Sequence, residues 1–370
     1  MKQIIRHILL IFTLLIAVTF LSSDVRATPP DGESVSKEQR TQTWAFSSFP
    51  DFFNFDVPNP WPRWDPAVDW FLNLVELEEP DFVLVAGDLV NGHWWEGPTS
   101  VEQMSALYYD AWKRRMANHN LKYYVAIGDH ELGDDPWPKE KLTLVPHFEK
   151  AFATHLGMPK NGPEGKKGLA YYVFHKNVLF ITVETFENVN DSIRATVTGE
   201  QLDWFKQVLR KYHDARYIIV QGHVPIFGEV KSRSSSKIML ESGLNSDFWQ
   251  AMADGGVDLY LCGEHHDVSV MESDGIWQIV HGSSWGREVV DTQNYLVGRF
   301  VSGNLLLEMK QIPMEVGGGH MWNLHKKRGP REVVMIPDSA KRAGPKTIGT
   351  LQIEKDAETK IYRNRTGIFK

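Results

Sequence analysis

The chain contains 370 residues, of which 42% are hydrophobic and 24% are charged, so it can form a large folded core. Its formal net charge of -7 at pH 7 argues against general nucleic-acid binding, and we expect no binding to a nucleic-acid duplex. The single cysteine, Cys262, excludes a disulfide within the chain, and we expect it to be a small buried side chain.

The first 27 residues have the pattern of a signal peptide. Lys2 and Arg6 precede an almost entirely apolar run over residues 8–21, and Val25 and Ala27 occupy the -3 and -1 positions of a cleavage site. The apolar run is shorter than the ~20 residues of a membrane span. We therefore expect export to the periplasm or the extracellular space, with no stable membrane span after cleavage. A retained N-terminal anchor is the alternative. Polar residues 28–41 are expected to form a flexible leader.

Residues 43–127 predict strands that alternate with helices. Each expected strand is a short apolar run, and each helix carries apolar residues three and four positions apart. Asp65 and Pro66 mark the start of the first helix as its N-cap and first helical residue. The expected strands are residues 43–49, 82–86 and 123–127, and the second helix is residues 100–119. Such alternation predicts a layered α/β fold.

The second half predicts further strands and two helices. A capping box that starts at Thr198 opens the first helix, and residues 245–254 form a second, short one. Residues 313–349 are rich in Gly and Pro and are expected to be a long loop. The expected strands are residues 169–174, 178–184, 217–220, 259–262, 277–281, 295–301, 304–311, 350–354 and 360–364. This gives a main domain at 42–312 and a loop-rich extension at 313–370, whose terminal strand pair packs on the domain.

Four short motifs place Asp, Glu or His just after a glycine at the end of an expected strand. Loops at the carboxyl ends of sheet strands are where α/β folds build their sites. Glycine permits the sharp turns that such loops need. The motifs are Gly87-Asp88-Leu89-Val90-Asn91, Gly128-Asp129-His130-Glu131, Gly222-His223-Val224-Pro225 and Gly263-Glu264-His265-His266. Four such motifs in series indicate ligands that converge on metal ions.

The order of these motifs resembles the calcineurin-like metallophosphoesterases over residues 43 to about 285. The resemblance implies a four-layer α/β/β/α sandwich with two metal ions. It implies that Asp88 bridges the ions and that Asp129, where the family usually has Asn, and His223 bind metal. His130 would stabilise the transition state or protonate the leaving oxygen rather than bind metal. It further implies that Asn91 and Pro225 support their loops and that Glu131 lies behind the ligands.

Two motifs depart from the family pattern. The first is normally Asp-x-His, but here Asp51 is followed by Phe53 at the His position, with Asn54 as a conceivable substitute. The last is normally Gly-His-x-His, but here Glu264 replaces the first His and His266 keeps the second. The implied ligand sets are Asp51, Asp88 and His266 for one ion, and Asp88, Asp129, His223 and Glu264 for the other. Oxygen-rich sets favour Mn, Fe or Mg over Zn, with one or two ions bound.

Taken singly, each motif has a plainer interpretation. Asp88 and Asp129 are then helix caps, His223 is a packed loop residue, and residues 264–266 form an exposed polar turn. Their joint order favours an exported metal-dependent phosphoesterase that hydrolyses a small phosphate mono- or diester through a metal-bound hydroxide. The alternatives are a catalytically weak or inactive relative that binds metal or phosphate, and a structural surface protein, which only the export signal supports.

Overall fold

The computed structural model describes residues 43–52, 57, 64–228, 235–282, 292–320, 332–356 and 359–370. All of them belong to one compact unit, Val35–Lys370. The expected signal peptide, the whole expected leader at 28–41, and Phe53 and Asn54 lie outside the described residues. Among the helices of the described residues, none combines the length and apolar character needed to cross a membrane.

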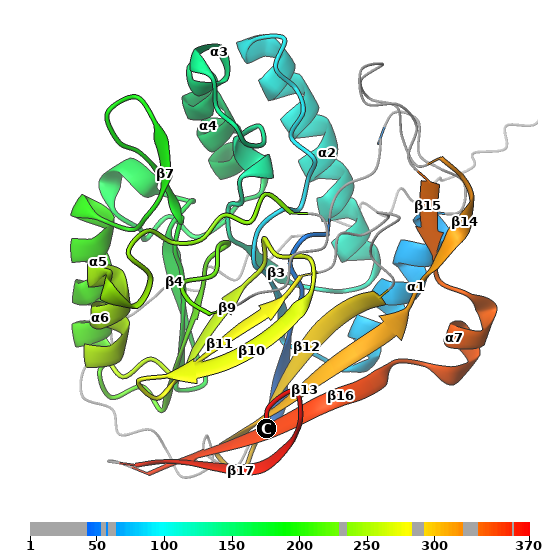
Figure 1. Cartoon of the computed structure of the whole chain (residues 1–370), viewed down its shortest axis with the longest axis vertical. Coiled ribbons are helices and arrows are strands. Elements are labelled where there is room, and N and C mark those ends of the chain that lie inside the picture. Colours follow the sequence, from blue (N-terminus) through cyan, green and yellow to red (C-terminus); the bar gives the residue numbers. More distant parts are fainter. Residues whose placement is uncertain are drawn as a thin grey trace, which may run out of the picture. The chain divides into compact units, whose positions relative to one another are not determined.

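A seven-stranded sheet forms one half of the core, in the order β17-β16-β13-β12-β1-β2-β3 (Figure 1). Strands β1, β2 and β3 are parallel, and the others pair antiparallel. β1 is buried along its whole length, as expected for a strand covered on both faces. The bounds are β1 (Trp44–Ser48), β2 (Phe82–Val85), β3 (Tyr123–Val125), β12 (Thr292–Val301), β13 (Asn304–Pro313), β16 (Lys346–Lys355) and β17 (Lys360–Gly367).

A six-stranded sheet forms the other half, in the order β10-β11-β9-β8-β5-β4. Its four inner strands are parallel, and antiparallel strands β4 and β10 form its edges. The bounds are β4 (Tyr171–His175), β5 (Val178–Thr182), β8 (Tyr217–Gln221), β9 (Leu259–Cys262), β10 (Val268–Ser273) and β11 (Ile276–His281). Two small hairpins complete the strands: β6 (Phe186–Asn188) with β7 (Ile193–Ala195), and β14 (Glu315–His320) with β15 (Glu332–Met335).

The described residues form seven helices, some of which cover the outer faces of the two sheets. They are α1 (Trp64–Leu77), α2 (Pro98–Asn118), α3 (Lys139–Leu142), α4 (Val145–His155), α5 (Gly199–Lys211), α6 (Asp247–Asp254) and α7 (Asp338–Ala343), with 3-10 turns η1 (His130–Leu132), η2 (Glu164–Lys166) and η3 (Gly243–Asn245). Phe71 of α1 packs on Tyr295 of the seven-stranded sheet, with ring centroids 5.7 Å apart. Phe248 of α6 packs on Tyr260 of the six-stranded sheet at 6.2 Å.

The two sheets pack face to face through aromatic side chains. Phe180 of β5 lies 5.5 Å from Phe46 and 4.9 Å from Phe82, measured between ring centroids, and both partners belong to the seven-stranded sheet. With helices on both outer faces, the layers run helix, sheet, sheet, helix (Figure 1). The predicted four-layer α/β/β/α fold is thus confirmed.

The structure corrects two local predictions. Thr198 is the N-cap of α5, but no side-chain capping bond forms. Its hydroxyl instead donates to Glu187, whose carboxylate also accepts the Thr198 backbone N–H. The expected loop at 313–349 contains β14, β15, α7 and the start of β16. Because β16 pairs with β13, the terminal strand pair extends the main sheet instead of packing on it.

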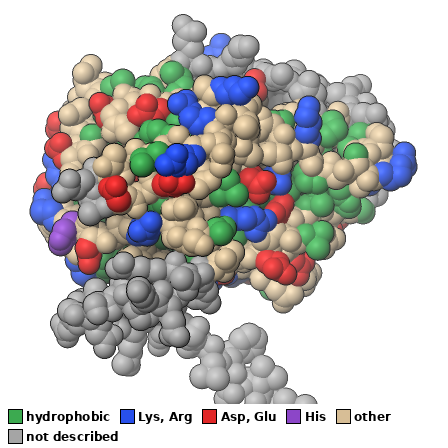
Figure 2. Space-filling model, turned by 90° about the horizontal axis from the view of Figure 1, so that it is seen from below, with side chains coloured by type: hydrophobic (Ala, Val, Ile, Leu, Met, Phe, Trp, Pro, Cys, Tyr) green, Lys and Arg blue, Asp and Glu red, His purple; other side chains and the backbone are tan. Residues whose placement is uncertain are grey.

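Charged groups are mixed on the surface. On the face shown in Figure 2, acidic, basic and apolar side chains alternate over the described residues. Such a surface fits the modest net charge of the chain.

Candidate metal centre

The structure brings together the six residues predicted to bind metal. Each lies just past the carboxyl end of a parallel strand: Asp51 after β1, Asp88 after β2, Asp129 after β3, His223 after β8, and both Glu264 and His266 after β9. All are buried. The site therefore joins the ends of both sheets, which is why its ligands are so far apart in the sequence.

The six side chains form two groups that share Asp88. The first contains Asp51, Asp88 and His266, and the second contains Asp88, Asp129, His223 and Glu264. Within each group the potential ligand atoms all lie within 4.8 Å of one another. A shared carboxylate between two such groups is the arrangement that a pair of closely spaced cations requires.

His223 is oriented as a ligand. Its Nδ1 donates a hydrogen bond of 2.9 Å to the carbonyl of Ala86, which directs Nε2 into the cluster. Nε2 lies 3.0 Å from Asp129, 3.3 Å from Asp88 and 3.4 Å from Glu264, measured to carboxylate oxygens. Burial lowers the pKa of His223, but these acids raise it well above its usual value. Either a proton or a cation is therefore needed at Nε2.

The cluster holds more buried negative charge than its histidines can balance. Burial raises the pKa of Asp51 and Glu264 to about 8 and that of Asp88 to about 7. Burial also opposes ionisation of Asp129, but His130 and His223 bring its pKa below the usual value. The Oδ2 atoms of Asp51 and Asp129 are buried without a hydrogen-bond partner in the described part of the chain. Unpartnered carboxylate oxygens that converge on one space fit bound cations well.

Comparison with known proteins identifies the family. The model of the calcineurin-like phosphoesterases matches residues 59–268, which is more than half of the chain. The chain belongs to this family. A search of the curated proteins gives no match.

Two solved structures of related fold illustrate the metallophosphoesterase architecture. A dimetal phosphatase from Danio rerio has 12% identity and a TM-score of 0.51, with 79% of this chain and 98% of that chain covered. The purple acid phosphatase PPD1 from yellow lupin seeds has 14% identity and a TM-score of 0.51, with 74% of this chain and 52% of that chain covered. At these identities the likeness concerns the fold alone.

Glycines let the loops of this metallophosphoesterase approach the ligands closely. A Cβ atom at Gly128 would lie 2.2 Å from Oδ1 of Asp88, and one at Gly87 would lie 2.3 Å from Nδ1 of His223. Asp88 and Glu264 themselves adopt left-handed backbone conformations, with φ of 58° and 65°. Such conformations cost on the order of 1 kcal/mol each and often occur at functional sites.

Glu131 was predicted to lie behind the metal-binding side chains. Its carboxylate ties together the two loops that carry Asp88 and Asp129. One of its carboxylate oxygens accepts the backbone N–H of Val90 at 2.9 Å. The other accepts the N–H groups of Asp88 at 2.9 Å and Gly128 at 2.8 Å. These bonds fix the loop after β2 against the loop after β3, so the positions of Asp88 and Asp129 are coupled.

His130 lies at the edge of the cluster. Its Nδ1 donates a 2.7 Å hydrogen bond to the carbonyl of Asn91, and its Nε2 lies 3.9 Å from Asp88 and 3.7 Å from Asp134. Burial lowers the pKa of His130, but Asp134, Asp88 and Asp129 together raise it to about 9. These acids favour the protonated ring, and Nε2 is directed at the cluster.

The sequence did not reveal the role of Asp134. Its Oδ2 lies 2.6 Å from Nε2 of His93, and its Oδ1 faces His130. The ring centroids of His93 and His130 are 5.6 Å apart. His93 therefore pairs with an acid that also faces His130. An aspartate four residues after His130 looks like an ordinary loop residue in the sequence.

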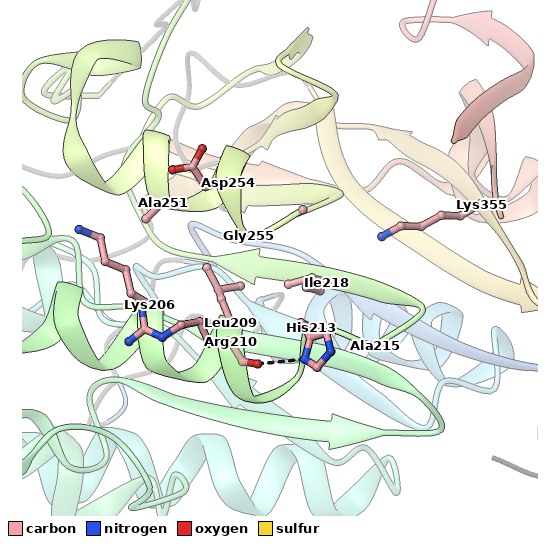
Figure 3. Close-up of a pocket in the computed structure, with 11 residues that line it drawn as sticks. Lys206, Leu209, Arg210, His213, Ala215, Ile218, Ala251, Asp254, Gly255 and Lys355 are labelled. Carbon is pink, nitrogen blue, oxygen red and sulfur yellow. Dashed lines mark hydrogen bonds between the residues drawn. The ribbon is translucent and has the colours of Figure 1, made fainter. Parts of the chain in front are cut away.

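A separate hollow lies at the other end of the six-stranded sheet (Figure 3). It measures about 500 Å³ and is lined by side chains of α5 and α6, by Ile218 at the start of β8, and by Gly256 before β9. The metal-binding groups follow the opposite ends of these two strands. β8 has five residues, which corresponds to about 16 Å of extended chain, so the hollow is not part of the metal centre.

Proposed function

We propose that the chain is a metal-dependent phosphoric ester hydrolase that acts on a phosphate mono- or diester. The observation that carries this proposal is the pair of ligand groups that share Asp88. Family membership supports the reaction class, because the chain belongs to the calcineurin-like phosphoesterases. Four carboxylates and two imidazoles would hold the ions, with Asp51, Asp88 and His266 around one and Asp88, Asp129, His223 and Glu264 around the other.

The donor set favours Mn, Fe or Mg over Zn, because four of the six side chains offer oxygen. Two divalent ions would also balance the four carboxylate charges. When bound, such ions polarise phosphate oxygens and lower the pKa of coordinated water. The protein supplies a buried site whose side chains are already held in position. Glu131 fixes the loops, and the Ala86 carbonyl fixes the His223 ring.

His130 is the proposed general acid. Hydrolysis breaks the bond between phosphorus and the leaving oxygen, and that oxygen must acquire a proton. With Nδ1 fixed on the Asn91 carbonyl, Nε2 of His130 is the atom available to donate it. Asp134, which is not one of the proposed ligands, lies beside Nε2 and raises the pKa of the ring, which favours its protonated form.

The test is activity and metal content of Asp88→Asn. We expect this change to lower kcat/KM for an aryl phosphate at least ~10³-fold, because both ligand groups lose their shared member. Asp203→Asn, an exposed change on α5, is the matched control and should behave as wild type. If the wild type with Mn, Fe or Mg hydrolyses neither mono- nor diesters, the enzyme proposal fails.

A non-catalytic binding protein is the second candidate. It is favoured by the first ligand group, which has only three members among the described residues. In that case the wild type would bind metal and inorganic phosphate without turnover, and Asp88→Asn would lose both binding activities.

We also propose that the protein is exported. The support is the basic, apolar and small-residue pattern of residues 1–27. Expression of the full chain in a bacterium with a periplasm should give a soluble periplasmic protein that begins at Thr28. Recovery of the uncleaved chain in the membrane fraction would contradict this and would indicate a retained anchor.

A further inference from the structure

A second hollow adjoins the metal centre. It measures about 390 Å³, within the ~300–1,000 Å³ range typical of ligand sites. Its walls come from the loop after η1, from the β6–β7 hairpin and from Ile238. The lining residues are Asp135, Pro136, Trp137, Phe186, Ser192, Ile193, Ala195 and Ile238.

Three contacts connect this hollow to the second ligand group. The ring of Phe186 lies 6.2 Å from the ring of His223, measured between centroids. The backbone N–H of Ile238 donates a 3.0 Å hydrogen bond to Oε1 of Glu264. The carboxylates of Asp135 and Asp129 approach within 4.8 Å. A phosphate held at the metal centre would thus have the hollow beside it for its ester group.

Two aromatic side chains belong to one wall of the hollow, of which Trp137 is half-buried and Phe186 is buried. The ring centroids of Trp137 and Phe186 are 5.7 Å apart, and the indole N–H of Trp137 donates a 3.0 Å hydrogen bond to the carbonyl of Leu132. That bond fixes the half-buried indole plane before any ligand arrives. Ile193 and Ile238, both partly exposed, contribute further apolar surface to the lining. A fixed aromatic face favours a flat, apolar ligand group.

The charge of the lining disfavours ester groups that are negatively charged. Asp135 is its only charged member among the described residues, and its carboxylate accepts a hydrogen bond from Ser236. An ester group that carries its own negative charge would be repelled here.

We propose that this hollow is the leaving-group subsite of the phosphoesterase, and that it selects phosphate esters of uncharged, planar aromatic alcohols. The inference rests on the proposed function of the metal centre. In the reaction, the oxygen of water bonds to phosphorus, the bond from phosphorus to the ester oxygen breaks, and that oxygen takes a proton. The aromatic alcohol leaves from the space between Trp137 and Ile238.

The test compares three esters: 2-naphthylmethyl phosphate, cyclohexylmethyl phosphate and methyl phosphate. For each ester, the ratio of variant to wild-type kcat/KM is measured on the metal-loaded full chain, so that intrinsic ester reactivity cancels. Trp137→Leu is the test variant. Trp204→Leu is the matched control, because Trp204 is also half-buried and also donates its indole N–H to a carbonyl, that of Asn161, but on α5.

We expect Trp137→Leu to lower kcat/KM about ten-fold for the naphthylmethyl ester and less than about two-fold for methyl phosphate. The control variant should change neither. Equal losses for all three esters would overturn the subsite, because they would show a general effect on the metal centre. Equal losses for the naphthylmethyl and cyclohexylmethyl esters would overturn the preference for aromatic groups.

Binding separates this proposal from the proposed function. If the wild type turns over none of the esters, the enzyme assignment fails. The subsite then stands if the metal-loaded protein binds 2-naphthylmethylphosphonate at least about ten-fold more tightly than Trp137→Leu does. It falls if the two proteins bind this probe equally or not at all.

Discussion

Buried acids occur at both ends of β9, and they are neutralised in different ways. Asp258, directly before the strand, is fully buried and forms ion pairs with Lys355 at 3.1 Å and Lys360 at 3.0 Å. Glu264, just after the strand, lies among three other buried carboxylates. In the described residues no Lys or Arg forms an ion pair with any of those four acids. The fold thus supplies lysines to the buried acid at one end of β9, whereas the described acids at the other end belong to the two ligand groups.

The largest effect on stability is expected when the lysine-paired acid, Asp258, is removed. Asp258→Asn should lower the free energy of unfolding by about 3–5 kcal/mol, because two partly buried lysines lose their counter-charge. The change should leave metal affinity as in wild type. Urea unfolding with and without Mn²⁺ measures both quantities. A loss below about 1 kcal/mol would mean that the lysines do not neutralise Asp258 in the way argued.

The pH dependence of stability should reveal the acids of the metal centre, which no described lysine or arginine pairs with. Without metal, Asp51 and Glu264 titrate at about 8 and Asp88 at about 7, each above its unfolded value. The folded state then holds more protons than the unfolded chain, so the free energy of unfolding falls as pH rises from about 5 to 8.

Saturating Mn²⁺ should reverse this trend, because the metal binds deprotonated ligands and its affinity increases with pH. Urea titrations in EDTA and in Mn²⁺ at several pH values give the two curves. Stability in EDTA that is flat or rises over this range would contradict the raised pKa values.

Removing one acid of the metal centre should change the free energy of unfolding in the opposite direction from Asp258→Asn. In metal-free protein at about pH 8, Asp51→Asn should raise the free energy of unfolding by about 2 kcal/mol, because it removes buried charge. The amide oxygen can still accept the backbone N–H of Glu264, now bonded to Asp51 Oδ1 at 3.0 Å. The same variant should bind Mn²⁺ more weakly. Destabilisation in EDTA would show that Asp51 is already satisfied without a cation.

The smallest effect is expected at the hollow between α5 and α6. Arg210 is exposed there, at the end of the sheet remote from the metal centre. Arg210→Ser should change the free energy of unfolding by no more than about 0.5 kcal/mol. Activity and metal affinity should stay at the wild-type level in kinetic and titration assays. A clear loss of activity would link the two ends of the sheet in a way the structure does not explain.

Much of the site could be predicted because its ligands follow strands whose sequences are plain apolar runs. The four glycine motifs mark those strand ends directly, and the layered fold follows from the alternation of elements. The sequence could not show that Glu187 would take the hydroxyl of Thr198, because β6 has only three residues and no periodic signal. Asp134, Trp137 and Phe186 were missed for a similar reason. Their roles come from tertiary contacts between short segments, which local patterns do not encode.

The most direct test of the central claim is the number of metal ions that the two ligand groups hold. Calorimetric titration of metal-free protein with Mn²⁺ in buffers of different ionisation enthalpy gives both the stoichiometry and the protons released. We expect about two equivalents per chain with net proton release for the wild type, and neither for Asp88→Asn. A wild type that takes up no Mn²⁺, Fe²⁺ or Mg²⁺ at millimolar concentration would contradict the account, and uptake of well under two equivalents would exclude the paired site.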